Sequence, residues 1–202
     1  AMELSVAAEK AGADALLVVS PYYNKATPEG LYAHFSAIAH GVNIPVILYN
    51  VPSRTAVDIP VSVYQRLSRI PNIVGVKEAS TDLTKITKIR NACGEGFTVW
   101  SGNDDLTVPA ISLGAKGVIS VASNAAPLEM VAMTDAALDG DLDTATEIQT
   151  KLHPLLELLF CEINPIPIKA AMKILGYDCG ICRLPLTALS PKNEEKLRGF
   201  LT

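Results

Sequence analysis

The chain has 202 residues, 19% of them charged and 49% hydrophobic, with a formal net charge of -4. This composition is typical of a globular protein and excludes a disordered, collagenous or low-complexity chain. No basic stripe favours nucleic acid, and no apolar run approaches the ~20 residues of a membrane span. No basic leader precedes the first apolar residues. We therefore expect a cytoplasmic protein that binds neither nucleic acid nor membrane.

Short apolar strands alternate with amphipathic helices along the first part of the chain. The predicted strands, rich in Val, Ile and Leu, are Ala15–Ser20, Val46–Val51, Ile73–Ala79, Thr98–Ser101 and Gly117–Val121. The predicted helices are Met2–Lys10, Pro28–His40, Val61–Arg69, Thr84–Cys93 and Leu106–Leu113. Such alternation is typical of a parallel sheet with helical connections.

From Ala126 onwards the pattern is helical, most clearly in Leu142–Phe160, Ile166–Leu175 and Asn193–Leu201. Two architectures fit the strands, an open doubly wound sheet and a (β/α)8 barrel. No G-x-G-x-x-G follows a strand, and polar residues gather after the strand ends, as on the active face of a barrel. We therefore predict an α/β protein with the (β/α)8 TIM barrel fold.

We place the two expected regions as follows. Residues 1–125 form a partial TIM barrel with five of the eight strands, strands 4 to 8, and residues 126–202 hold the last barrel helix and a C-terminal helical region. Five strands leave two apolar edges open, so we expect this chain to aggregate.

The cysteines predict neither a metal site nor a redox site. Cys179 and Cys182 have C-x-x-C spacing, but they follow a predicted helix end and no second C-x-x-C is present. We interpret them as part of a structural loop, and we expect no metal ion and no cofactor.

Lys77 is the first candidate for chemistry because it lies near the C-terminal end of an apolar strand. Burial lowers the pKa of a lysine and yields an amine that attacks carbonyl groups. The alternative is a lysine that forms a salt bridge or extends to solvent. Lys116 also adjoins a strand but precedes it, and polar residues at that end usually concern stability.

Two loops after neighbouring strands carry further candidates. Tyr49 ends the strand before that of Lys77, so its phenol can pass protons near the amine, unless it is only a packed aromatic. Arg54 follows in a Pro-braced loop and suits a small carboxylate, or caps a helix. Tyr22 and Tyr23 form either an active-site pair or an interface pair.

Several segments together resemble one family of pyruvate-dependent aldolases. They are Pro21–Asn24, Leu48–Thr55, Gly75–Ser80, Ser101–Asp104 and Gly117–Val121, with Asn164–Lys169 and Arg183–Thr187 in the tail. In this order and spacing they resemble the dihydrodipicolinate synthase family. The resemblance covers the whole chain, which corresponds to the C-terminal two-thirds of a member of that family. The family's early Thr-Thr pair, which completes its proton relay and binds the pyruvate carboxylate, has no counterpart here.

The resemblance implies a role for individual residues. Lys77 corresponds to the lysine that forms a Schiff base with pyruvate, Tyr49 to a proton-relay tyrosine, and Arg54 to a carboxylate-binding arginine. Tyr23 corresponds to a second relay tyrosine contributed across a dimer interface, with Tyr22 stacked beside it. Backbone groups at Gly102 and Ile119 correspond to the lining of the pyruvate pocket.

The implied reaction is the condensation of pyruvate with L-aspartate 4-semialdehyde in lysine and diaminopimelate biosynthesis, by a homotetramer built as a dimer of dimers. One alternative is a sister lyase, such as N-acetylneuraminate lyase or a keto-sugar-acid aldolase. Arg54 favours the synthase, because the segment that contains it differs in those lyases. An alternative of another class is a non-catalytic fragment or pseudo-enzyme.

Overall fold

The computed structural model describes residues 1–202, which divide into two compact units. Unit 1 contains residues 1–103 and 109–119, and unit 2 contains residues 104–108 and 120–202. The domain boundary expected after residue 125, between a partial barrel and the C-terminal helices, stays a prediction.

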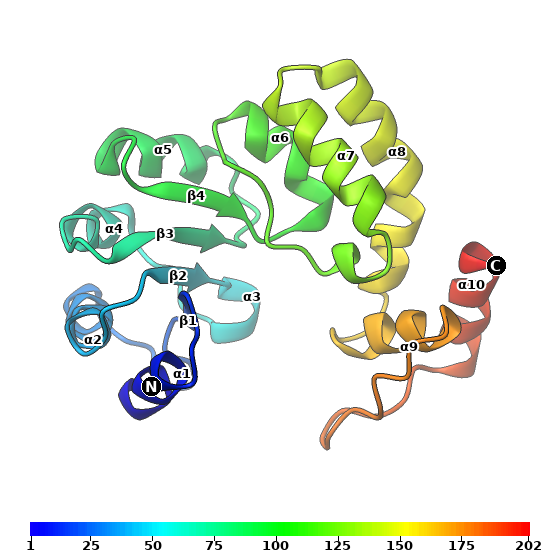
Figure 1. The fold of residues 1–202 in the computed structure, drawn as a ribbon, viewed down its shortest axis with the longest axis horizontal. Coiled ribbons are helices and arrows are strands. Elements are labelled where there is room, and N and C mark those ends of the chain that lie inside the picture. Colours follow the sequence, from blue (N-terminus) through cyan, green and yellow to red (C-terminus); the bar gives the residue numbers. More distant parts are fainter. The chain divides into compact units, whose positions relative to one another are not determined.

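Unit 1 is built on a parallel sheet whose four strands follow the order of the sequence. The strands are β1 (Leu16–Val19), β2 (Val46–Asn50), β3 (Ile73–Glu78) and β4 (Thr98–Ser101). Helix α1 (Met2–Lys10) precedes β1, and α2 (Pro28–His40), α4 (Val61–Leu67) and α5 (Thr84–Cys93) connect successive strands (Figure 1). All four strands and all four helices were predicted, with bounds that differ by three residues or fewer.

Local sequence explains where the longest of these helices begins and ends. The side chain of Thr27 accepts a hydrogen bond from Gly30 N, and Pro28 occupies the first turn, where its missing N–H costs nothing. Gly41 is the C-cap at its other end, with a φ of -90°, and its N–H still donates to Ala37 O and Ile38 O. These signals place α2 at the residues that the sequence indicates.

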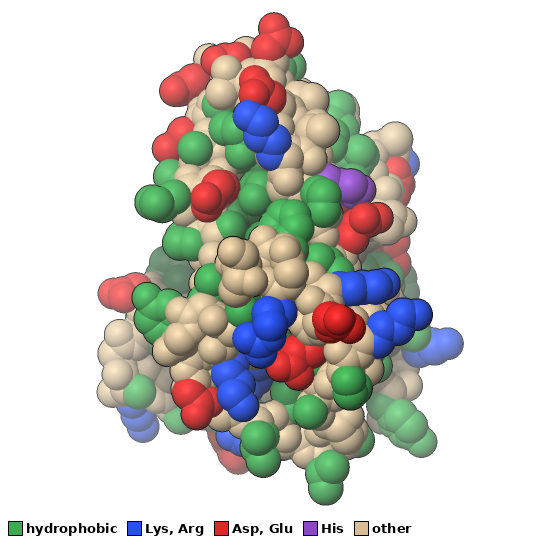
Figure 2. Space-filling view, turned by 90° about the vertical axis from the view of Figure 1, so that its right-hand side faces the viewer, with side chains coloured by type: hydrophobic (Ala, Val, Ile, Leu, Met, Phe, Trp, Pro, Cys, Tyr) green, Lys and Arg blue, Asp and Glu red, His purple; other side chains and the backbone are tan.

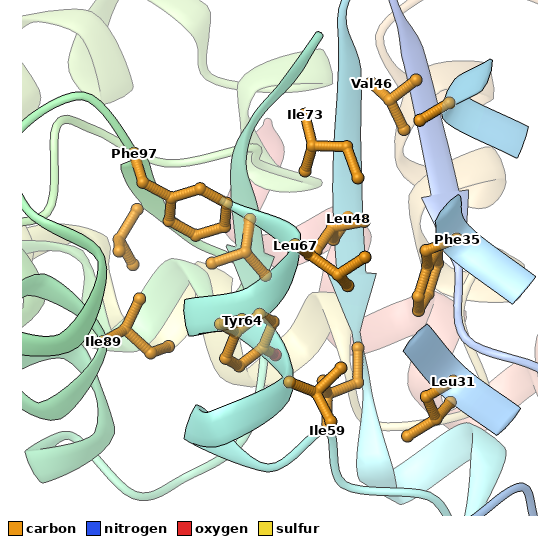
Figure 3. Close-up of a cluster of buried hydrophobic side chains, with 14 of the residues drawn as sticks. Leu31, Phe35, Val46, Leu48, Ile59, Tyr64, Leu67, Ile73, Ile89 and Phe97 are labelled. Carbon is orange, nitrogen blue, oxygen red and sulfur yellow. The ribbon is translucent and has the colours of Figure 1, made fainter. Parts of the chain in front are cut away.

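The main core of unit 1 lies between the sheet and its helices. In Figure 3 the side chains of Phe35 on α2, Leu67 on α4 and Ile89 on α5 gather with those of Leu48 on β2 and neighbouring residues. All four of these side chains are fully buried. Because successive strand residues point to opposite faces, Leu48 turns toward the helices while Tyr49 turns away from them.

The fifth predicted strand, residues 117–121, is shorter than expected. Only Val118 forms a bridge, with Ser101 of β4, although Gly117 O and Ile119 N also bond the backbone of Ser101. The chain then turns, because Asp104 Oδ2 accepts hydrogen bonds from the N–H groups of residues 121 and 122 at 3.1 and 3.0 Å. The turn continues as the short helix η2 (Ala122–Asn124).

Unit 2 is helical. Its main helices are α7 (Pro127–Leu138), α8 (Leu142–Leu159), α9 (Ile166–Ile174) and α10 (Pro191–Leu201). Helix α7 packs along α8, and α10 contacts both α8 and α9. The predicted helix 106–113 is divided into η1 (Asp104–Leu106) and α6 (Thr107–Ser112), which lie at the boundary of the two units in the chain.

Three further features bear on function. Acidic, basic and apolar side chains are interspersed on the face of the molecule that Figure 2 shows. None of the helices is both long and apolar enough to cross a membrane. Cys179 and Cys182 lie between α9 and α10, and all four cysteines are free thiols.

Candidate active site

Lys77 and Tyr49 lie side by side on neighbouring strands. They are paired in the register of β2 and β3, and Lys77 Nζ is 4.5 Å from the centre of the Tyr49 ring. Lys77 is 8% exposed. The structure thus brings together the two residues that the sequence analysis placed first, a buried amine and a phenol at the C-terminal end of the sheet.

Close packing around Lys77 involves a glycine just after the next strand, β4. A Cβ atom at Gly102 would lie 3.2 Å from Lys77 Cε and 2.5 Å from the Cβ atom of Ala79. Gly102 N donates a 2.7 Å hydrogen bond to Glu78 O, which fixes this close approach. A side chain at this position would collide with Ala79 and press on the Lys77 side chain, so glycine keeps the space beside Lys77 open.

The segment with Ile119 lies on the outer side of β4. Ile119 N donates to Ser101 O at 2.9 Å, so residue 119 follows the C-terminal end of β4. Trp100 of β4 is paired with Lys77 in the strand register. Sequence reasoning missed this tryptophan, the one Trp of the chain, because a lone aromatic in an apolar strand gives no functional signal.

Arg54 influences the phenol of Tyr49. Burial raises the pKa of Tyr49 above its ordinary value of 10.0, and the positive charge of Arg54 partly opposes this rise. The predicted loop around Arg54 is in fact a one-turn helix, α3 (Pro52–Thr55), which starts with a proline and ends at Ala56. Ala56 has a φ of 53°, in the left-handed region where a helix commonly ends.

Tyr22 and Tyr23 are largely exposed, at 69% and 92% of their surface. They follow β1 in a tight turn in which Asn24 N donates to Tyr22 O at 2.9 Å. Tyr23 has a φ of 65°, which is uncommon for a residue other than glycine and costs of order 1–3 kcal/mol. The chain by itself thus leaves this pair in solvent rather than against Lys77.

A buried polar cluster lies on the opposite, helix-facing side of β2 and β3, and sequence reasoning missed it. Asn50 and Glu78, the residues after Tyr49 and Lys77, are its centre. Its signal in the sequence is a polar residue that continues an alternating row of buried apolar residues, as Glu78 does after Val76. No group of three or more Cys, His, Asp or Glu side chains is arranged to hold a metal ion.

Comparison with known proteins places this geometry in a family. The model of the dihydrodipicolinate synthetase family matches residues 1–202. The chain belongs to this family. The 4-hydroxy-tetrahydrodipicolinate synthase of Thermoanaerobacter sp. (strain X514) is 49% identical over an alignment of 203 residues that covers all of this chain and 68% of that protein.

Solved structures of the dihydrodipicolinate synthetase family agree with the fold. A chloride-inhibited dihydrodipicolinate synthase from Acinetobacter baumannii, complexed with pyruvate, is 45% identical and superposes with a TM-score of 0.94. A structure described as the first monomeric dihydrodipicolinate synthase variant is 42% identical, with a TM-score of 0.95. The alignments cover 99% of this chain and 69% and 68% of those chains. The (β/α)8 barrel class of the family confirms the predicted fold class.

Proposed function

We propose that this chain performs the reaction of a 4-hydroxy-tetrahydrodipicolinate synthase, the condensation of pyruvate with L-aspartate 4-semialdehyde. The single observation that carries the proposal is that the buried Lys77 and the half-buried Tyr49 lie at paired positions of adjacent strands. The name of the Thermoanaerobacter relative and the pyruvate bound to the Acinetobacter structure support the same chemistry. The name of that relative, rather than the pyruvate, favours this reaction over those of the sister lyases.

The first half of the reaction takes place on Lys77. Its neutral amine attacks the ketone carbon of pyruvate, and the resulting carbinolamine loses water to form an imine. Loss of a proton from the pyruvate methyl group then gives an enamine. Tyr49 is the group that donates protons to these intermediates and takes them back, because its ring lies next to Lys77 Nζ and its raised pKa keeps the resting phenol protonated.

The second half forms the new carbon–carbon bond. The enamine carbon attacks the aldehyde carbon of the semialdehyde, whose oxygen takes up a proton. The amino group of the semialdehyde then attacks the imine carbon, which closes the ring and releases the amine of Lys77. We assign the carboxylate of the semialdehyde to Arg54, because a guanidinium binds a carboxylate through two parallel hydrogen bonds.

A second copy of the chain completes the site in this proposal. Tyr23 is 92% exposed in the single chain, so its side chain is available to contact a neighbouring copy. We propose a homotetramer built as a dimer of dimers, with Tyr22 and Tyr23 at the dimer interface. We also propose a cytoplasmic location, which the four free thiols support because thiols persist in a reducing compartment.

Trapping of the imine tests the proposed function. Incubation with pyruvate and borohydride should add one reduced pyruvate to the intact protein, and peptide mapping should place it on Lys77. Lys77→Arg should remain unlabelled, because a guanidinium is not a nucleophile near neutral pH. Labelling at another lysine would overturn the assignment, and no labelling at all would favour the non-catalytic alternative.

A further inference from the structure

A buried hydrogen-bond cluster lies directly behind the proposed catalytic pair. Glu78 and Asn50 occupy paired positions on β3 and β2, one residue after Lys77 and Tyr49. Both are buried, with 4% and 0% of their surface exposed. Because neighbouring strand residues point to opposite faces, their side chains turn toward the helices while those of Lys77 and Tyr49 turn away from them.

Both oxygens of the Glu78 carboxylate have partners. Oε1 accepts hydrogen bonds of 2.8 Å from Asn50 Nδ2 and from Ser80 N. Oε2 accepts one of 3.2 Å from the hydroxyl of Tyr64 on α4, and it lies 3.5 Å from Nζ of Lys85 on α5. Glu78 thus joins the end of its own strand to the neighbouring strand and to two helices.

Asn50 is held as firmly as Glu78. Its Nδ2 also donates to Asp58 Oδ1 at 2.8 Å, and its Oδ1 accepts a 3.0 Å hydrogen bond from Ile59 N. Asp58 in turn forms an ion pair with Lys85 and is 57% exposed, so it marks the solvent end of the cluster. The side chain of Lys85 is only 7% exposed and is buried between the carboxylates of Asp58 and Glu78.

We propose that Glu78, with Asn50, is a positioning residue that holds Lys77 and Tyr49 at their mutual distance during imine formation. A strand end fixed on its helix-facing side cannot rotate, so the preceding side chain keeps its direction on the other side. Backbone hydrogen bonds also hold these strand ends to their neighbours. Glu78 O accepts a hydrogen bond from Gly102 N, and Asn50 O accepts one from Ala79 N. This inference rests on the proposed function of Lys77.

Glu78→Gln is the test because it preserves shape and removes the charge. Either the glutamine NH2 group faces the Lys85 ammonium, or it faces the two N–H donors of Asn50 and Ser80. In both orientations a donor meets a donor, so the end of the strand shifts. The measurement is the rate of pyruvate imine formation, from borohydride quenching and intact mass, over a range of pyruvate concentrations.

We expect the saturating rate of Glu78→Gln to fall by about 10-fold or more, with the half-saturating pyruvate concentration changed by less than about 3-fold. Tyr64→Phe removes one hydrogen bond to Glu78 and keeps the packed ring, so we expect a smaller, few-fold decrease. This second variant gives the answer if Glu78→Gln does not fold.

Asn72→Ala is the matched control for stability. Asn72 Nδ2 donates to Ala39 O and Val42 O at 2.8 and 3.2 Å, just before β3 and far along the strand from Lys77. We expect this variant to lower the Tm and to leave the imine rate unchanged. Unchanged rates in Glu78→Gln and Tyr64→Phe, or an equal loss in Asn72→Ala, would overturn the positioning role. Absence of imine in the unsubstituted protein would instead overturn the proposed function.

Discussion

Arg54 provides the sharpest prediction for a single residue. Arg54→Ala should lower kcat/KM for the semialdehyde by about 10- to 150-fold, the equivalent of the ~1.5–3 kcal/mol of a charged hydrogen bond. Imine formation with pyruvate should continue, because the carbon–nitrogen bond forms at Lys77 without the second substrate. Borohydride trapping measures the first step, and a coupled condensation assay measures both steps.

The same substitution has an electrostatic consequence at Tyr49. The positive charge of Arg54 lowers the pKa of that phenol, so its removal should raise the pKa further and keep the phenol protonated. Arg54→Lys serves as the control, since it retains the charge but loses the planar guanidinium. An equal loss of imine formation and condensation in Arg54→Ala would contradict a role confined to the second substrate.

Single residues were predictable where a residue type is rare in its setting. A lysine or tyrosine near the end of an apolar strand is such a case, and the structure pairs Lys77 with Tyr49. The helix-facing cluster around Glu78 was not predicted, because Lys85 and Tyr64 join it from helices distant in the sequence. Only folding brings these groups to one carboxylate.

At the scale of single elements, α2 should make stability depend on pH through His34. Burial lowers the pKa of His34 below its ordinary value of 6.5. Between that lowered pKa and 6.5 the unfolded chain binds more protons than the folded chain, so stability falls as the pH falls. The Tm should therefore decrease between about pH 7.5 and pH 5, and His34→Gln should flatten part of this decrease.

Thermal unfolding over this pH range, followed by circular dichroism, measures the effect. Above about pH 8 histidine is neutral in both states, so the slopes of the two proteins should there coincide. Equal slopes at acid pH as well would show that His34 does not contribute.

Helices and strands were predictable where the sequence carries both a periodic apolar pattern and residues that mark the ends of the element. Thr27, Pro28 and Gly41 bound α2, and its predicted range is the observed one. The strand expected at residues 117–121 is reduced to a single bridge. The apolar run could not reveal that a carboxylate distant in the sequence accepts hydrogen bonds from N–H groups at its end. Asp104 binds the N–H groups at residues 121 and 122 and turns the chain away. The one-turn helix α3 was missed since four residues are too few to show a period.

At the scale of the whole molecule, the two edges of the sheet in unit 1 differ. The edge at β4 is covered, because Lys116 N donates to Val99 O, Ser101 N to Gly117 O, and Ile119 N to Ser101 O, all at 2.8 to 2.9 Å. Strand β1 pairs only with β2 and has no strand on its other side. It also presents Leu17, which is 46% exposed. An apolar, uncovered edge strand is a template for pairing with another chain.

We expect the chain to self-associate through β1, and Leu17→Lys should weaken this association because a charged side chain at an edge opposes pairing. Sedimentation velocity over a range of protein concentrations measures it, as a decrease in the proportion of large species. Leu138→Lys is the matched control, since Leu138 is 45% exposed, close to the value for Leu17, and belongs to α7 of unit 2 rather than to the sheet. Both variants add the same charge and remove an exposed leucine. An equal decrease in the two would show that association follows exposed apolar area in general, and no decrease in Leu17→Lys would show that the β1 edge is not the contact.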